Sequence, residues 1–212
     1  SLIGEAWFLE NLIGIRKRGY EFAKRGIDVM LALIIGVFGA LTFPFVALAI
    51  VLEAPGPVFF RQQRAGRNGR IITLLKYRST YRTEAPATPT GRTKNEPGVY
   101  TTIGAWLRKT YLDEIPQILN ILKGEMSFVG PRPERPEYVA DLKRRVPFYE
   151  MRLLVPPGMS GWAQINMTDD AAVEDAPEKM QYDLYYVKNR SFILDLLIML
   201  RTLFTLMRRQ GR

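Results

Sequence analysis

VMLALIIGVFGALTFPFVALAIVL, residues 29–52, contains no charged side chain, and this run decides the class of fold. As an α-helix its 24 residues would extend about 36 Å, enough to cross the hydrocarbon core of a bilayer. A signal peptide is a poor interpretation, because the run is too long, starts late and lacks a small-residue cleavage pattern. The run therefore predicts a membrane-embedded helix.

Basic residues flank this run on both sides. Before it stand Arg16, Lys17, Arg18, Lys24 and Arg25, and after it stand Arg61, Arg64, Arg67 and Arg70. Positive charge marks the cytoplasmic side of a membrane, so a simple crossing predicts an imbalance between the two ends. Pro44, near the middle, removes an intrahelical hydrogen bond and can bend the helix. Together these features favour a re-entrant helix that enters and leaves on the cytoplasmic face, over an ordinary span with a proline kink.

The composition limits the chemistry. The 212 residues include no histidine and no cysteine, which excludes thiolate nucleophiles, disulfides and the common zinc ligands. Any bound metal is expected to be a hard, oxygen-ligated ion such as Mg²⁺. The net charge of +9 predicts an anionic partner, which is nucleic acid, anionic lipid or a phosphorylated small molecule. No P-loop, dinucleotide fingerprint or nucleic-acid-binding signature is present.

The rest of the chain mixes short strands and helices. Residues 57–79 predict a hairpin with a basic turn, 82–100 a surface loop, 102–122 a helix with one apolar side, 137–151 a further helix, 155–166 a turn that leads into a short strand, and 181–209 one or two helices. The last of these is mostly apolar but contains Asp195 and Arg201. A membrane span rarely carries such charges, whereas an interfacial helix does.

TYLDEIPQIL, residues 110–119, places two adjacent carboxylates in an apolar stretch. The simpler explanation is that Asp113 caps a helix, with Glu114 in the first turn and Pro116 where its missing N–H costs little. The alternative is catalytic. Neighbouring helical residues point about 100° apart, so the two carboxylates suit two roles, one as a nucleophile on phosphorus and one as a magnesium ligand.

Several cations accompany these acids. Lys76 and Arg78 alternate along a predicted strand, and Arg108 stands five residues before Asp113. Arg132 lies between Pro131 and Pro133, whose fixed φ angles limit where its guanidinium can point. A planar guanidinium on a stiff backbone suits bidentate capture of a phosphate group. Each cation taken singly is as well explained by a solvated or headgroup-facing charge, and the Pro-Arg-Pro arrangement is the hardest to explain that way.

Taken together, these motifs resemble the bacterial sugar transferases, the monotopic polyprenyl-phosphate hexose-1-phosphate transferases (phosphoglycosyl transferases). The similarity runs from about Tyr20 to the C-terminus and rests on several long motifs in order. They are RGIDVMLAL, PGPVFFRQQRAGRNG, LLKYRST, IGAWLRKTYLDEIPQILNILKGEMSFVGPRPE, PPGMSGWAQIN and YDLYYVKNRSFILDLLIMLRT. SLIGEAWFLENL, at the start, resembles the linker before the catalytic domain of larger members, which carry extra N-terminal membrane helices.

The resemblance implies a two-step reaction. An NDP-sugar, usually UDP-linked, gives its phosphosugar to an aspartate and releases a nucleoside monophosphate, and the phosphosugar then passes to a polyprenyl phosphate. It implies that Asp113 is the nucleophile and that Glu114, with Asp113, holds Mg²⁺. A one-step transfer without a covalent aspartate is the alternative mechanism.

The resemblance also assigns the cations. Arg108 and Arg132 match family positions that bind phosphate, and Lys76 and Arg78 lie in the Lys-aromatic-Arg-Ser motif near the site. Asp183 lies in the family's Tyr-Asp stretch and is assigned to the architecture of the site.

The sequence departs from the family pattern at three places. Pro44 matches the proline that breaks the re-entrant helix, but Phe43, preceded by Thr42, replaces the serine that is common before it. Tyr111 stands where serine is usual, two residues before the nucleophile. WAQINMTDD, residues 162–170, differs from the usual Trp-Gln-Val-x-Gly-Arg ending, where sugar or nucleotide preference could be set. The sequence therefore leaves the sugar open.

We predict an α/β membrane-associated fold with an N-terminal re-entrant membrane helix, amphipathic interfacial helices and a small β-hairpin or sheet region. Residues 1–26 are expected to form a linker and basic interfacial segment, 27–53 the membrane helix, and 54–212 a cytosol-facing catalytic domain with C-terminal interfacial helices. The expected location is the cytoplasmic face of the bacterial inner membrane.

The predicted activity initiates surface polysaccharide, such as exopolysaccharide, or glycoconjugate synthesis. The expected partners are the NDP-sugar, polyprenyl phosphate and membrane lipid, but not nucleic acid, and a homo-oligomer is left open. The main rival is a non-catalytic membrane-bound tether for anionic lipid or partner proteins, which would need neither the acid pair nor Pro-Arg-Pro. A membrane-proximal nucleic-acid binder is a second rival and predicts steep salt dependence.

Overall fold

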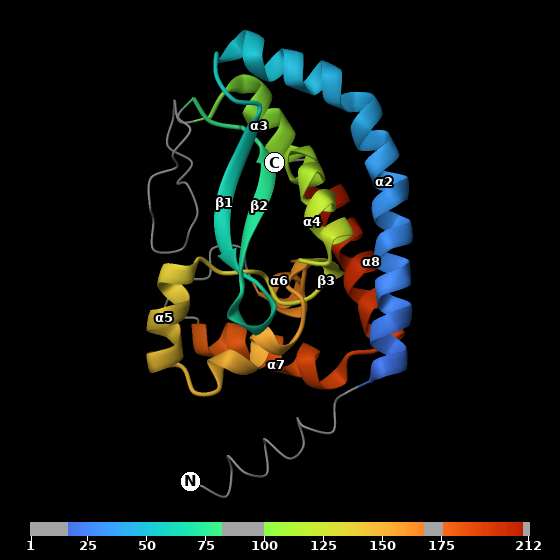
Figure 1. Cartoon of the computed structure of the whole chain (residues 1–212), viewed down its shortest axis with the longest axis vertical. Helices are drawn as coiled ribbons and strands as arrows, with labels where there is room; N and C mark the ends of the chain where they lie inside the picture. Colours follow the sequence, from blue (N-terminus) through green and yellow to red (C-terminus); the bar gives the residue numbers. More distant parts are fainter. Residues whose placement is uncertain (1–16, 82–99, 168–175, 210–212) are drawn as a thin grey trace, which may run out of the picture.

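The computed structural model describes residues 17–81, 100–167 and 176–209 (Figure 1). The α-helices are α2 (Arg18–Glu53), α3 (Thr102–Lys109), α4 (Ile118–Lys123), α5 (Pro136–Arg145), α6 (Trp162–Asn166), α7 (Ala176–Asn189) and α8 (Phe192–Arg209). Three 3-10 helices are described: η1 (Arg67–Gly69), η2 (Leu112–Gln117) and η3 (Tyr149–Leu154). The strands are β1 (Phe59–Ala65), β2 (Ile71–Tyr77), β3 (Ser127–Val129) and β4 (Gly158–Ser160). Strands β1 and β2 form an antiparallel hairpin, and β3 and β4 a short parallel pair. The predicted combination of a long apolar helix and a small hairpin region is confirmed within a mostly helical molecule. The loop predicted at 82–100 lies almost wholly outside the described residues.

Helix α2 contains the whole apolar run and starts earlier than predicted. It is continuous over 36 residues from Arg18, so no break separates the basic segment from the membrane helix at residues 26 and 27. The helix is long and apolar enough to cross a membrane, and only 11% of its most apolar window is buried inside the molecule. That exposure distinguishes α2 from the core helix of a soluble protein. Pro44 lies inside the helix, which bends over the top of the molecule (Figure 1).

The first half of α2 is anchored to the body of the molecule by its own charged residues. Lys24 forms an ion pair of 2.8 Å with Asp195 of α8. Arg25 donates to the carbonyl oxygens of Ile121 and Leu122 at 2.5 and 2.8 Å, in the last turn of α4, where carbonyl oxygens lack the regular donor four residues later. Several of the basic residues that flank the apolar run therefore bind protein groups rather than lipid headgroups.

The other end of α2 is anchored by Arg78, which follows β2. Its buried guanidinium donates to the carbonyl oxygens of Ile50, Ala54 and Pro55. The carboxylate of Glu53 accepts the backbone N–H of Ile103 at 2.8 Å and that of Thr102, at the start of α3. Both ends of α2 are thus attached to the rest of the described molecule.

Three aromatic rings join the bent part of α2 to the hairpin. Phe43, Phe59 and Tyr77 stack with ring centroids 5.7 to 6.5 Å apart and interplanar angles of 6 to 20°. Phe43 stands beside Pro44, at the position where the sequence departs from the family pattern. Thr42 donates its hydroxyl to the carbonyl oxygens of Phe38 and Gly39, a bond that commonly accompanies helix bending. The bend is therefore supported by packing as well as by the proline.

The single helix predicted over residues 102–122 is wrong. Helix α3 ends at Lys109, and Tyr111 adopts a left-handed conformation with φ of 58°. The chain then continues through η2 into α4. Pro116 lacks an N–H and its ring crowds the carbonyl four residues earlier, which disfavours a regular α-helix through this point. Because Tyr111 is the N-cap of η2, the capping explanation for Asp113 is also wrong.

Two further predictions need correction. The helix predicted at 137–151 is divided into α5 and η3 by Phe148, whose φ is 60°. The segment predicted as a turn that leads into a short strand does contain one, β4, which pairs with β3, but residues 162–166 form helix α6, which was not predicted. Gly130 and Gly158 meet there so closely that a Cβ on Gly158 would lie 2.1 Å from the Gly130 nitrogen, and this contact brings the Pro-Arg-Pro segment against β4.

The C-terminal region consists of two helices, α7 and α8. One face of α8 packs with Tyr186, Val187 and Val129 in a buried cluster, while its opposite face exposes large apolar side chains. They are Phe192, Ile193, Leu196, Leu197, Leu200, Leu203 and Phe204. Asp195 is on the inner face, where it accepts hydrogen bonds from Tyr20 and Tyr186 and pairs with Lys24. Its charge therefore does not interrupt the exposed apolar face.

The environment of Arg78 generates a stability prediction. Arg78→Met should lower the free energy of unfolding by about 2–4 kcal/mol, because three carbonyl oxygens, two of them in buried contacts, lose their charged donor. The measurement is the melting temperature in detergent, which should fall by several degrees. Arg61→Met, at an exposed position of the same hairpin, should change it little. An unchanged melting temperature together with weakened donor binding would instead make Arg78 a phosphate ligand.

Candidate active site

The acid pair lies in η2, directly after the left-handed turn at Tyr111. A non-glycine residue in this conformation costs about 1–3 kcal/mol and is most often kept at functional sites. The turn directs the start of η2 against strand β2 and leaves Asp113 buried, with 8% of its surface exposed. Asp113 and Glu114 are thus presented by a short, constrained 3-10 helix rather than by a loop.

Glu114 is held by Lys76 of β2. Their side chains form an ion pair of 2.5 Å in which both groups are largely shielded from solvent. Burial alone would raise the pKa of Glu114, but the charges of Lys76, Arg132 and Arg108 hold that pKa below its ordinary value. Glu114 is therefore ionised at neutral pH, with Lys76 as its cationic partner.

The pKa of Asp113 is shifted in the opposite direction. The pKa of Asp113 is raised to about 6, mainly by burial. The charge of Lys76 opposes this rise, and that of the neighbouring Glu114 contributes to it. Two adjacent carboxylates thus differ in proton affinity because only Glu114 has a direct cationic partner. Such separation of pKa values is typical of carboxyl pairs that perform different tasks.

A buried ionic network binds the backbone of the Pro-Arg-Pro segment. Arg152 of η3 donates 2.7 Å to the carbonyl oxygen of Arg132 and forms a 2.8 Å ion pair with Asp183 of α7. Glu134 pairs with Lys179, also of α7, and lies 3.8 Å from Arg152. Burial raises the pKa of Asp183, with Arg152 opposing, whereas Lys179 and Arg152 outweigh burial at Glu134 and hold its pKa at about 2.

Asp183, predicted to be part of the site's architecture, therefore acts on Arg132 indirectly, because it binds Arg152, which in turn binds the Arg132 carbonyl oxygen. Sequence reasoning missed that intermediary, Arg152, together with Glu134 and Lys179. No spacing signal connects these three, because they come from separate elements. The sequence offered one clue to this network, which is that Glu134 directly follows the Pro-Arg-Pro segment.

The polar side chains converge on a narrow pocket between the hairpin, η2 and the Pro-Arg-Pro segment. It is lined by Arg64, Leu74, Lys76, Glu114, Gln117, Arg132, Pro133, Gly158 and Met159. Three cations therefore surround one carboxylate, and Asp113 is the neighbour of that carboxylate in the chain. An excess of positive charge in a partly enclosed pocket suits a diphosphate. Arg64 was absent from the predicted site residues, although it belonged to the basic turn.

Two predicted cations lie outside this pocket. Arg108 lies over the ring of Tyr100, with its guanidinium carbon 4.4 Å from the ring centroid, and its charge lowers the pKa values of both acids. It is thus close enough to act on both acids but does not line the pocket. Arg78 is committed to the carbonyl oxygens at the end of α2, so the structure brings together Lys76 and Arg132 but not Arg78.

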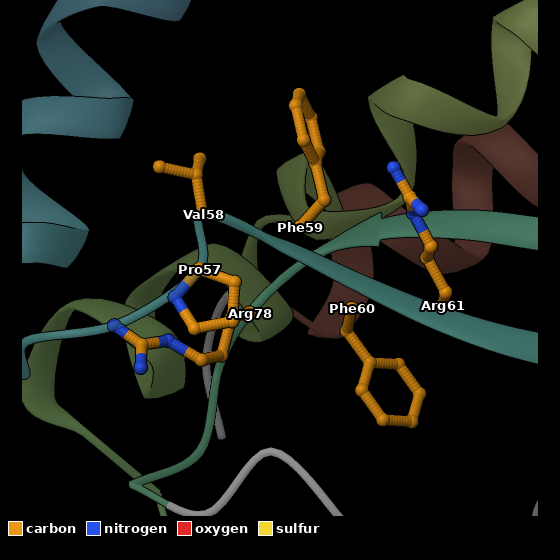
Figure 2. A pocket seen from close by; sticks show the side chains of 6 residues that line it. All are labelled: Pro57, Val58, Phe59, Phe60, Arg61 and Arg78. Carbon is orange, nitrogen blue, oxygen red and sulfur yellow. The ribbon is translucent and has the colours of Figure 1, made fainter.

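A larger, open cavity of about 460 Å³ lies where α2 meets the hairpin. Figure 2 shows its lining by Pro57, Val58, Phe59, Phe60, Arg61 and Arg78, with Phe59 and Phe60 on opposite sides of the strand. Its described lining is mostly apolar and includes no carboxylate. It therefore lacks the chemistry of the smaller pocket, which we take as the candidate active site.

The acid pair fits a magnesium ion that is shared with substrate. No group of three or more metal-ligating side chains exists among the described residues, so a site made of protein ligands alone is not found there. Mg²⁺ typically binds one or two carboxylates, several waters and substrate phosphates. Asp113 and Glu114 supply that number of carboxylates.

Comparison with known proteins places this site in a family. A model of the bacterial sugar transferase family matches residues 19–209. The chain belongs to the bacterial sugar transferase family. The matched region includes the acid pair, the hairpin, the Pro-Arg-Pro segment and most of α2.

Three relatives illustrate the range of similarity. The chain is 40% identical over 189 residues to the UDP-N-acetylgalactosamine-undecaprenyl-phosphate N-acetylgalactosaminephosphotransferase of Aeromonas hydrophila, covering 89% of this chain and 44% of the relative. It is 38% identical over 183 residues to the UDP-glucose:undecaprenyl-phosphate glucose-1-phosphate transferase of Escherichia coli (strain K12), covering 85% and 39%. It is 40% identical over 187 residues to the exopolysaccharide production protein PSS of Rhizobium leguminosarum bv. phaseoli, covering 84% and 92%. The chain thus spans less than half of the first two relatives and nearly all of the third.

The two acids should respond oppositely to removal of their charge. Asp113→Asn should stabilise the protein at pH 8 by up to ~3 kcal/mol, because a carboxyl whose pKa rises on folding costs stability once it ionises. The gain should shrink at pH 5 and vanish below the unfolded-state pKa. Glu114→Gln should destabilise at both pH values, because Lys76 loses its partner. Melting temperatures of the two variants, each at pH 8 and pH 5, make the comparison, and a destabilised Asp113→Asn at pH 8 would contradict it.

Proposed function

We propose that this protein transfers a sugar-1-phosphate from an NDP-sugar, most simply a UDP-sugar, to a polyprenyl phosphate through a covalent phosphosugar on Asp113. The observation that carries the proposal is the buried acid pair beside a pocket in which three cations converge. The relatives from Aeromonas and Escherichia are named for UDP-sugar donors and an undecaprenyl phosphate acceptor. Membrane-bound exopolysaccharide or glycoconjugate synthesis is the corresponding process.

In the first step a carboxylate oxygen of Asp113 attacks the phosphorus that bears the sugar. A bond forms between that oxygen and phosphorus, and the bond from phosphorus to the bridging oxygen breaks. The bridging oxygen leaves with the nucleoside monophosphate, which carries the bonding electrons as negative charge. Asp113 is suited to this role because it has no ion-pair partner of its own among the described residues, whereas Lys76 occupies Glu114.

In the second step a phosphate oxygen of the lipid attacks the same phosphorus. The bond to Asp113 breaks, the carboxylate is restored, and the product is a polyprenyl diphosphate-linked sugar. Arg132 and Lys76 bind and orient phosphate oxygens in both steps, and Arg108 lowers the electrostatic cost of bringing an anion to the acids. Positioning and charge neutralisation are most of what phosphoryl transfer requires from a protein.

Asp113 and Glu114 would hold Mg²⁺ together with the substrate phosphates. The ion would neutralise charge on the phosphate oxygens as it develops. Glu114 is the better ligand of the two, since its lowered pKa keeps it ionised. Lys76 must then exchange part of its contact with Glu114 for a phosphate oxygen, which the flexible lysine side chain allows.

The attachment of both ends of α2 to one body supports a re-entrant path. A straight crossing would separate the ends by the thickness of the bilayer, which would break the contacts of either Arg25 or Arg78. In this arrangement residues 27–53 enter the membrane from the cytoplasmic face of the bacterial inner membrane, and the exposed face of α8 lies in the interface. Residues 54–212 form the cytosol-facing catalytic part.

Turnover gives the direct test. Protein in detergent with Mg²⁺, a short polyprenyl phosphate and a panel of UDP-sugars should release UMP with at least one sugar. Asp113→Asn should reduce the rate by at least about 10³-fold, as expected for loss of a nucleophile. Without acceptor, mass spectrometry should find one phosphosugar on a peptide containing Asp113. Turnover by Asp113→Asn would exclude the covalent route and leave one-step transfer.

The pH dependence of the first step adds a second readout. With the pKa of Asp113 at about 6, the rate should fall as pH decreases through 6, because the protonated carboxyl is not a nucleophile. A surface aspartate would retain activity to about pH 4.

Membrane topology is testable by single-cysteine labelling, because the chain has no native cysteine. Arg18→Cys and Tyr81→Cys flank the apolar run at exposed positions. Both should react with a membrane-impermeant maleimide in inverted membrane vesicles and neither in intact spheroplasts. Val37→Cys, within the run, should be protected in both. Labelling of the two flanking positions from opposite sides would establish a straight crossing.

A further inference from the structure

The narrow pocket holds two guanidinium groups whose charges have no carboxylate partner. Lys76 is neutralised by Glu114, but Arg64 and Arg132 form no ion pair with any described residue. The guanidinium of Arg132 makes no hydrogen bond there either, although its backbone carbonyl is bound by Arg152. Arg64 is partly buried. Burial, together with the charge of Arg132, lowers the pKa of Arg64 to about 10. Glu134 and Glu137 act on Arg64 at longer range, and Glu114 acts on Arg132, but none of them forms an ion pair with either guanidinium. An anion bound between the two arginines would therefore supply the direct partner that both lack among the described residues.

Arg64 is nevertheless fixed in orientation. Its Nε and Nη2 donate to Oε1 of Gln62 at 3.2 and 2.6 Å, and its Nη1 donates to the Pro133 carbonyl oxygen at 3.3 Å. The next residue, Ala65, donates its N–H to the carbonyl oxygen of Glu134 at 2.8 Å. An arginine has five N–H donors, so the three bonds leave one on each terminal nitrogen. That pair of donors is the fork that binds phosphate in a bidentate manner.

The free space in the pocket is about 20 Å³, close to the volume of a single water. A phosphate group therefore enters only by displacing side chains at the mouth. Lys76 and Arg132 are the long, flexible members of the lining that no neutral acceptor fixes among the described residues. They can move outward around an anion without a change in the backbone, while Arg64 keeps its orientation.

We propose that Arg64 and Arg132 form one anion subsite that serves both half-reactions, a proposal that rests on the function proposed above. In the first step the subsite holds the phosphate of the departing nucleoside monophosphate. In the second it holds the phosphate of the polyprenyl acceptor. The attacking and leaving oxygens of phosphoryl transfer lie roughly in line, so Asp113 occupies one side of the reacting phosphorus in both steps. The leaving and the entering phosphate must then use the same opposite side.

The test measures binding to Asp113→Asn protein in detergent by calorimetry, with UMP and a short polyprenyl phosphate as probes. The two probes should compete, so that saturation with one abolishes binding of the other. Arg64→Gln should weaken both by at least about tenfold and by similar factors. Arg70→Gln, which removes the same charge at an exposed position of the same hairpin, should change neither by more than about twofold.

Several results would overturn the shared subsite. They are simultaneous binding of both probes, a loss confined to one of them, or equal effects of Arg64→Gln and Arg70→Gln. If Arg64→Gln lacks a cooperative melting transition, Arg64→Lys decides, because it keeps the charge and loses the fork. It should weaken both probes by about threefold or more, and wild-type affinity would reject the proposal.

Failure of this inference is distinguishable from failure of the proposed function. UMP release by the wild-type protein, with unaltered probe binding by Arg64→Gln, would leave the transferase function in place and remove the subsite. Conversely, competition between the probes that depends on Arg64, without turnover on any donor, would keep the subsite and reject the reaction.

Discussion

The structure depends on the attachment of both ends of α2 to the same body. Arg25 reaches into the end of α4, and Arg78 reaches back into the end of α2. These contacts fix an apolar and otherwise exposed helix relative to α4 and the hairpin, which are the two elements that border the acid pair. A helix that met the body at one end only could not position the site, because its apolar surface has few partners inside the molecule. The position of this exposed apolar helix and the geometry of the site therefore depend on the same hydrogen bonds.

Several charged groups of the site lack direct partners of opposite charge among the described residues, and this favours the binding of an anionic substrate. Asp113 is buried with no ion-pair partner among the described residues, which raises its pKa, and two guanidinium groups nearby have no carboxylate partner. Each of these arrangements destabilises the folded protein relative to a neutral, packed interior. A diphosphate bound with Mg²⁺ would relieve them together, since it supplies anions to the arginines and a cation to the carboxylates. Binding energy of this kind is available for orienting the reacting phosphorus.

Much of the fold was predictable from local pattern. The charge-free run gave α2, and alternation around a Gly-rich basic turn gave the hairpin. The helix breaks at Tyr111 and Phe148 were not predictable, because both depend on a left-handed backbone at an aromatic residue, which tertiary packing imposes against local preference. For the site, the Asp-Glu pair and Pro-Arg-Pro were visible as motifs. The ionic network of Arg152, Asp183 and Glu134 was not, since its members are brought together only by the packing of α7 against η3.

The partners of the arginines separate structural from substrate-binding roles more reliably than their position in the sequence. Arg25, Arg78 and Arg152 are committed to carbonyl oxygens or a buried carboxylate, so they hold elements together and have little capacity for phosphate. Arg132, on a backbone fixed by two prolines, has a guanidinium with no hydrogen-bond or ion-pair partner among the described residues, and Arg64 is held by neutral acceptors that do not neutralise its charge. Because neutral acceptors orient a guanidinium without cancelling its charge, this arrangement keeps the cation available to an anion. The same criterion explains why Lys76, paired with Glu114, must change partners for catalysis while Arg64 need not.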